Sequence, residues 1–238
     1  MALPKLSDVP KYDIIIPSTG VKTKYRPYLV KEEKILLMAV ETGDEKEISN
    51  ATIELIKSCV EAKIDARRLT VFDMEYLFTQ IRSKSVGEKA TVVLKCQSCE
   101  HENPVDILLS DALVELKDGI KNMIPLTDKI SAEMRYLSYY DLLDDNVLRE
   151  SKTEAELLFN TILSSIEAIH TEDERLVLKD EPKEEVIEFI NNLTTSQFDR
   201  LKEFVEHTPQ VKLDVNYKCE SCGHDNHLTL RGLQDFFQ

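Results

Sequence analysis

The stretch KCQSCEHEN at residues 95–103 recurs as KCESCGHDN at residues 218–226, with six of the nine positions identical. Each copy, called a knuckle below, contains two cysteines separated by two residues. This spacing lets two thiolates bind one ion through a tight turn, and two such turns supply the four sulfur ligands of a structural zinc site. The sequence therefore predicts one structural zinc ion shared by Cys96, Cys99, Cys219 and Cys222.

Other uses of these cysteines stay open at this point. A redox dithiol needs a single pair at the start of a helix, whereas alternating apolar residues predict strands on both sides of each knuckle. Disulfides are disfavoured in a reducing cytosol. His101 and His224 are predicted to be hydrogen-bond partners or exposed side chains, because four thiolates complete the shell. Cys59 lies among apolar residues at helical spacing and is assigned to the core.

The residues after the second cysteines differ between the knuckles. Gly223 suits a left-handed turn. The matching residue is Glu100, so the first knuckle is predicted to be the more strained of the two.

The two halves of the site are far apart in sequence. Residues 100–218 separate them, whereas a compact zinc motif usually has roughly 15 to 20 residues between its pairs. Weaker matches link residues 16–29 to 124–137, 53–56 to 187–190 and 69–77 to 193–201, which indicates an internal duplication of residues 11–110 and 119–234.

The predicted fold is therefore α+β, with an N-terminal lobe (1–110) and a C-terminal lobe (111–238). Each lobe contains a β-hairpin, helices, and a strand–knuckle–strand unit, and the two share a zinc-ribbon-like site. Helices are expected over residues 30–43 and 45–62 and from an N-cap at Asp73. An apolar stripe from Ala155 to Ile169 predicts another helix, and an acidic connector follows at residues 171–185.

Composition and charge argue against several functional classes. The chain has 238 residues and a formal net charge of −14, which disfavours long-range attraction to phosphate and hence nucleic-acid binding. Apolar runs such as Ile35–Val40 are far shorter than the roughly 20 residues of a membrane span. The charged, proline-containing segment Met1–Tyr12 does not read as a secretory signal, so we expect a cytosolic protein.

Catalytic motifs are not evident in the sequence. We find no glycine-rich phosphate loop or nucleophile elbow. Acid pairs such as Asp144-Asp145 and Glu184-Glu185 are interpreted as solvated surface, as are His170 and His207. Because a four-thiolate zinc site is closed to substrate, we predict that the protein is not an enzyme.

The N-terminal part also carries a family resemblance. The segments YDIIIPSTG (12–20), YRPYLVKEEKIL (25–36), FDMEYLF (72–78) and RSKSVGE (82–88) resemble the baseplate hub assembly proteins of T-even-type tailed bacteriophages, and the similarity extends through the knuckles. Members are regarded as hub components or assembly chaperones. The resemblance implies a late viral morphogenesis protein in the infected cell's cytoplasm or the virion baseplate, with hub or tail proteins as partners and no catalytic residues.

Two surfaces are candidates for partner contacts. For the first, an ordinary solvated hairpin face is the alternative, whereas the second is expected to dock onto its own domain. The first is residues 18–29, with Lys22, Lys24 and Arg26 at alternate positions before Pro27-Tyr28-Leu29. The second contains Leu233, Phe236 and Phe237. A rival function is a zinc-ribbon nucleic-acid or transcription-type factor, supported only by Lys95, Lys218 and Tyr217.

Overall fold

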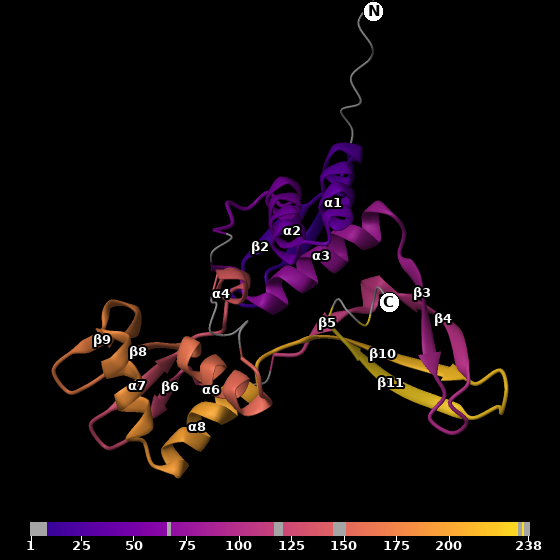
Figure 1. Cartoon of the computed structure of the whole chain (residues 1–238). Helices are drawn as coiled ribbons and strands as arrows, with labels where there is room; N and C mark the ends of the chain where they lie inside the picture. The colour runs from indigo at the N-terminus through magenta and orange to yellow at the C-terminus, as the bar shows by residue number, and fades with distance from the viewer. Residues whose placement is uncertain (1–8, 66–67, 117–120, 145–150, 233–234, 236–238) are drawn as a thin grey trace, which may run out of the picture. The chain divides into compact units, whose positions relative to one another are not determined.

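A computed structural model describes residues 9–65, 68–116, 121–144, 151–232 and 235 of the chain (Figure 1). The chain forms two compact units. Unit 1 contains Met1–Glu115 and Gln210–Gln238, and unit 2 contains Leu116–Pro209. Both contain helices and antiparallel strands, so the mixed α and β composition is confirmed.

Unit 1 begins with the predicted hairpin, formed by β1 (Tyr12–Ile15) and β2 (Lys22–Tyr25). Three helices follow: α1 (Val30–Thr42), α2 (Glu45–Cys59) and α3 (Val71–Ser85). Helix α1 ends where Gly43 adopts a left-handed conformation with a φ of 69°, as expected for a glycine that terminates a helix.

Helix α2 ends earlier than predicted because the residues that follow Cys59 pair with strand β2. Val60 forms an antiparallel bridge with Tyr25, and the backbone N–H of Glu61 donates to the carbonyl of Lys24 at 2.9 Å. The N–H of Val60 still bonds to the carbonyl of Ile56, but from Glu61 on the backbone pairs with β2 and does not continue the helix.

The predicted N-cap of α3 is also wrong by one turn. Thr70 is the N-cap, and its hydroxyl accepts from the N–H of Asp73 at 3.2 Å. The Asp73 carboxylate accepts in return from the N–H of Thr70 at 3.1 Å and from that of Ser18 at 2.9 Å. Asp73 thus completes a capping box and ties the hairpin turn to the helix.

The rest of unit 1 consists mainly of two hairpins. One is β3 (Lys89–Lys95) with β4 (Glu102–Leu108), followed by a short 3-10 turn η2 (Leu109–Asp111). The other is β10 (Val211–Lys218) with β11 (Asp225–Arg231), and β5 (Leu113–Val114) pairs with β10 at its start. Residues of both hairpins share one buried core cluster: Val92, Ile107, Leu109, Ala112, Val211, Leu213, Val215 and Leu230.

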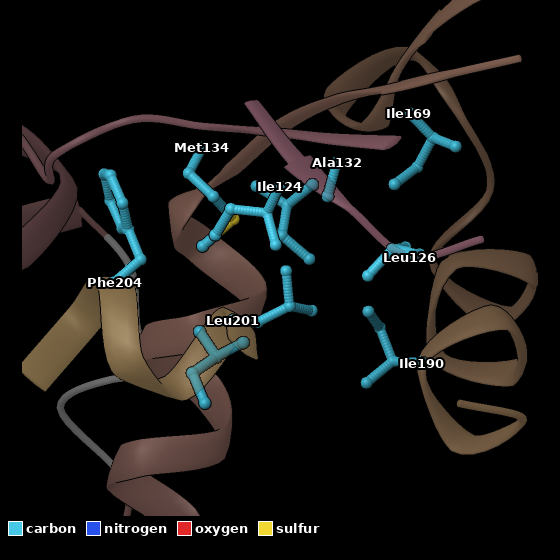
Figure 2. Packing of buried hydrophobic residues seen from close by; sticks show 10 residues of the cluster. Ile124, Leu126, Ala132, Met134, Ile169, Ile190, Leu201 and Phe204 are labelled. Atoms are coloured by element: carbon cyan, nitrogen blue, oxygen red, sulfur yellow. The ribbon is translucent and has the colours of Figure 1, made fainter. Parts of the chain in front are cut away.

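Unit 2 contains a four-stranded antiparallel sheet in the order β6 (Met123–Pro125), β7 (Ser131–Met134), β8 (Ile166–His170) and β9 (Arg175–Val177). Its helices are α4 (Tyr139–Asp144), α6 (Glu154–Ser165), α7 (Lys183–Asn191) and α8 (Thr195–Glu206), with a 3-10 turn η3 (Leu178–Asp180). In Figure 2, Leu201 of α8 and Ile190 of α7 point towards apolar side chains of the sheet.

The apolar stripe predicted as one helix from Ala155 to Ile169 is divided between two elements. Helix α6 ends at Ser165, and Ile166 and Ile169 belong to strand β8. Both isoleucines are buried in the core of unit 2. Burial was therefore predicted correctly, but a run of apolar residues does not by itself separate a helix end from the start of a buried strand.

The compact units differ from the lobes predicted at 1–110 and 111–238, because β10 and β11 pack with β3 and β4 in unit 1. The order of elements nevertheless recurs in part along the chain. Residues 12–108 run from a hairpin through helices to a strand–knuckle–strand unit; residues 123–231 also start with a hairpin and end with such a unit, but strands β8 and β9 lie between their helices.

Several contacts are alike in the two halves of the chain. Arg26 bonds to Glu32 at 2.8 Å, and Arg135 bonds to Asp141, six residues on in each case, at 2.6 Å. Each of these carboxylates accepts the backbone N–H three residues before it. Arg26 N–H donates to the carbonyl of Cys59, and Arg135 N–H to that of Ser165. The two carbonyls belong to the last residues of α2 and α6, whereas the sequence match had paired α2 with α7.

Candidate metal centre

The two knuckles are tight turns with the same backbone hydrogen bonds. In the first, the N–H of Cys96 donates to the carbonyl of His101, and the N–H of Glu100 donates to the carbonyl of Cys96, both at 2.9 Å. In the second, the equivalent bonds from Cys219 to His224 and from Gly223 to Cys219 are also 2.9 Å long. Each hairpin therefore presents its two cysteines from a turn of the same shape.

The structure brings the four predicted cysteines together. Their sulfur atoms all lie within 4.8 Å of one another, and in the described ranges they are the one such group of three or more Cys, His, Asp or Glu side chains. Cys96 Sγ lies 3.7 Å from Cys222 Sγ, and Cys99 Sγ lies 3.6 Å from Cys219 Sγ. A disulfide would need about 2.05 Å, so these are free thiols that could hold one metal ion.

The surroundings of the sulfurs favour the negatively charged thiolate form of the first cysteine in each knuckle. Cys96 and Cys219 are buried, whereas Cys99 and Cys222 are exposed. Burial opposes ionisation of Cys96, but the N–H groups of Ser98 and Cys99 outweigh it and lower its pKa to about 6. The pKa of Cys219 is also lowered, chiefly by the N–H of Cys222.

Cys99 shows the opposite shift. The N–H of His101 favours its thiolate, but the neighbouring sulfur of Cys222, burial and the sulfurs of Cys219 and Cys96 outweigh it and raise the pKa. Negative charge on one sulfur thus opposes charge on the next, and a bound cation would relieve this repulsion.

The residue after each second cysteine adopts the left-handed conformation that was expected. Gly223 has a φ of 72°, and Glu100 has a φ of 58°. Glu100 is the one described residue other than glycine with a positive φ. Because a side chain is disfavoured in this conformation, the prediction that the first knuckle is the more strained is consistent with the geometry.

The histidines contribute through their backbone. The carbonyls of His101 and His224 accept the cysteine N–H bonds described above, while both side chains are exposed. Cys59 is buried on α2, which agrees with its assignment to the core, and burial raises its pKa to about 11.

Sequence reasoning missed two buried asparagines. Asn103 on β4 and Asn226 on β11 are only 1% and 3% exposed. Asn103 Oδ1 accepts from the N–H of Glu220, and Asn226 Oδ1 accepts from the N–H of Gln97, both at 2.9 Å. The available signal was their presence at the same position in both knuckles, which sequence analysis recorded without assigning a role.

The first predicted contact surface is partly engaged within unit 1. Arg26 bonds to Glu32, to the carbonyl of Ser58 and to that of Pro27. Lys22, Lys24 and Leu29 are exposed. The second surface, at Leu233, Phe236 and Phe237, lies outside the described residues.

The histidines dismissed as catalytic have structural partners. His170 Nε2 lies 2.7 Å from Glu133 Oε2, which also accepts from Arg175. His207 Nδ1 lies 2.7 Å from the carbonyl of Glu203. No described helix combines the length and the apolar character that crossing a membrane requires.

Taken together, these features define a mixed α/β protein with a candidate four-cysteine metal centre. The chain belongs to the T4 bacteriophage base plate protein family, whose model matches residues 9–238. It is 28% identical over 229 residues to the baseplate hub assembly protein gp26 of Enterobacteria phage T4, covering 96% of this chain and 97% of that protein. No solved structure matches the chain. The family resemblance inferred from the sequence is confirmed, and a role in phage baseplate morphogenesis follows.

Proposed function

We propose that this protein is a non-enzymatic assembly factor or component of the baseplate hub of a contractile-tailed phage, acting through protein–protein contacts. The observation that carries the proposal is the match over residues 9–238 to a base plate protein family, together with a hub assembly protein that aligns along nearly its full length. Its partners are other hub or tail proteins. It acts in the cytoplasm of the infected cell, and a component would also remain in the virion.

A complementation experiment tests this function. Phage lacking the gene should fail to complete hubs, and the chain supplied in trans should restore infectious particles. Probing purified virions with an antibody separates a chaperone, which is absent from the finished particle, from a component. Normal hub assembly in the deletion phage would contradict the proposal.

The bound metal is proposed to be zinc in a structural role. Zn–S bonds of about 2.3 Å give sulfur separations of about 3.8 Å in a regular tetrahedron, close to the 3.7 and 3.6 Å between the sulfurs of opposite knuckles. Four thiolates leave zinc no position for substrate, which supports a structural ion. Metal analysis of the purified chain should give one zinc per chain. A metal-free protein whose cysteines cycle between thiol and disulfide would favour the redox alternative.

The repeated lobes are proposed to descend from a duplication. The similar Arg–carboxylate bonds support this, as does a second contact. Ser18 donates its N–H to Asp73, and Leu126, which aligns with Ser18, bonds to Gln197 in the opposite direction, its carbonyl accepting from Gln197 Nε2 at 3.0 Å. Asp73 and Gln197 are both the third residue of their helix. The proposed lobes are the two segments that would have arisen by duplication, whereas the compact units are the two groups of residues that pack together in the fold.

The exposed part of the first contact surface is proposed to meet a hub partner. Lys22 and Lys24 lie on β2, and Leu29 precedes α1. Replacing both lysines by glutamate should impair complementation while leaving the zinc content unchanged. Full complementation by this variant would exclude the surface.

The nucleic-acid rival has less support. Of its three residues, Tyr217 donates its hydroxyl to the carbonyl of Lys95 at 2.8 Å, and Lys95 Nζ lies 3.9 Å from Glu102. Salt-sensitive retention of the chain on DNA or RNA would revive this function.

A further inference from the structure

The two knuckles are joined by hydrogen bonds that cross between the hairpins. Asn103, on the first hairpin, accepts the N–H of Glu220 in the second knuckle. Asn226, on the second hairpin, accepts the N–H of Gln97 in the first knuckle. Gln97 and Glu220 immediately follow Cys96 and Cys219, so each bond holds the backbone beside a buried sulfur.

Each asparagine also bonds to its own knuckle. Asn103 Nδ2 donates to the carbonyl of His101 at 2.7 Å, and Asn226 Nδ2 donates to that of His224 at 3.1 Å. Those same carbonyls accept the N–H groups of Cys96 and Cys219. Each asparagine side chain therefore links two groups. One is the histidine carbonyl that accepts the first cysteine's N–H in its own turn, and the other is a backbone N–H of the opposite turn.

Only a carboxamide fits both roles without a charge. Its oxygen accepts from one knuckle while its NH₂ group donates to the other. Aspartate would keep the acceptor, lose the donor and add negative charge beside thiols, and leucine would lose both bonds. Because both side chains are almost fully buried, leucine at either position would put an apolar group where the backbone of the two turns now has its hydrogen-bond partners.

From this geometry we infer that Asn103 and Asn226 are a crossed pair of positioning residues, which dock the knuckles on each other and arrange the four sulfurs before the metal binds. The inference deepens the zinc site proposed above and rests on that proposal for its effect on metal binding. The crossed bonds themselves involve only protein groups.

The crossed pattern can be tested on the unaltered protein and on two variants. In the zinc-loaded full-length chain, the amides of Gln97 and Glu220 should be protected from hydrogen exchange. Asn103→Leu should expose the Glu220 amide most, and Asn226→Leu that of Gln97. Exchange of both amides at unstructured rates in the unaltered protein would overturn the inference, even if the variants failed to fold.

Metal affinity gives the second readout. Changes in residues that orient metal ligands typically cost roughly 10- to 100-fold in affinity, so each variant should show a loss of that size in competition with a chromophoric chelator. The matched control is Asn216→Leu, because Asn216 is exposed on β10, next to the second knuckle, and its variant should keep the original affinity. Unchanged affinity in Asn103→Leu and Asn226→Leu would overturn the positioning role.

The design separates the two proposals. If the unaltered protein binds no metal, the zinc proposal fails. The crossed pair would still be supported if the Gln97 and Glu220 amides were protected in that metal-free protein and lost protection in the respective variants.

Discussion

The two knuckles share their cysteines, their turn hydrogen bonds and their crossed asparagines, but three of their nine positions differ, and so does the residue just before each knuckle. The left-handed residue is glutamate in the first and glycine in the second. The second hairpin has Tyr217 bonded to Lys95, and the equivalent position in the first is Leu94. The shared features are thus those that place the sulfur atoms, and we expect the differing features to affect only the stability of each turn.

Loss of a sulfur ligand should have the largest effect on zinc binding and on stability, and the effect should be equal for the two knuckles. Cys96→Ser and Cys219→Ser are each expected to abolish stoichiometric zinc binding, because the proposed ion takes ligands from both knuckles. Structural zinc can contribute on the order of 10 kcal/mol of apparent folding free energy. Metal analysis and thermal unfolding with and without a chelator measure both effects.

Cys59→Ala is the control for this experiment, since Cys59 is a buried core residue on α2. It should retain one zinc per chain despite weaker packing. A full complement of zinc in either knuckle variant would show that one knuckle suffices and would refute the shared site.

Making the second knuckle resemble the first should have a smaller effect on the stability of its hairpin. Gly223→Glu places a side chain on a residue with a φ of 72°, which costs about 1 to 2 kcal/mol. The nearest atom to a new Cβ is Lys218 Cε at 3.8 Å, an ordinary contact, so backbone conformation and not crowding sets the cost. Hydrogen exchange of the β10 and β11 amides would measure it, and no change would argue against the left-handed turn.

Removing the Tyr217 hydroxyl tests the second difference. Tyr217→Phe loses the bond to the Lys95 carbonyl, and a typical hydrogen bond contributes about 0.5 to 1.5 kcal/mol. We expect a loss at the lower end, because this side chain is half-buried and water can replace the bond. Urea denaturation should register the loss with zinc content unchanged. A loss of zinc would instead give Tyr217 a role in metal binding.

Making the first knuckle resemble the second should have the smallest effect on stability, and it should stabilise the hairpin, whereas the changes above destabilise it. Glu100→Gly relieves a strained φ of 58° but increases the freedom of the unfolded chain. The expected net gain is a few tenths of a kcal/mol. The same hydrogen-exchange measurement on β3 and β4 amides would detect it. A clear destabilisation would mean that the Glu100 side chain makes a contact worth more than the strain.

The four-cysteine cluster could be predicted from sequence because its signal is doubled. A single C-x-x-C is ambiguous, but two copies in matching frames point to one shared site. The asparagines were in the same frames and received no role. Their function depends on a bond from each to the opposite hairpin, and sequence carries no information on which backbone N–H lies opposite a side chain.

The errors in the fold have a related cause. The start of α3 was placed at Asp73 and not at Thr70, because aspartate and threonine are both good N-caps and the contact with Ser18 that fixes Asp73 comes from far along the chain. Helix α2 was extended past Cys59 for the same reason, since its end is set by pairing with Tyr25. Local pattern predicts which elements exist, and distant contacts decide where they stop.

The separation of the knuckles has a consequence in time. Residues 100–218 are synthesised between Cys99 and Cys219, which takes roughly 6 to 24 s at about 5 to 20 residues per second. Throughout that interval the first turn exists on the ribosome with two of the four sulfurs and without the backbone N–H that Asn103 accepts. Binding of the proposed ion by all four sulfurs would therefore be among the last events of this chain's folding, and the supply of metal would act on an almost finished molecule.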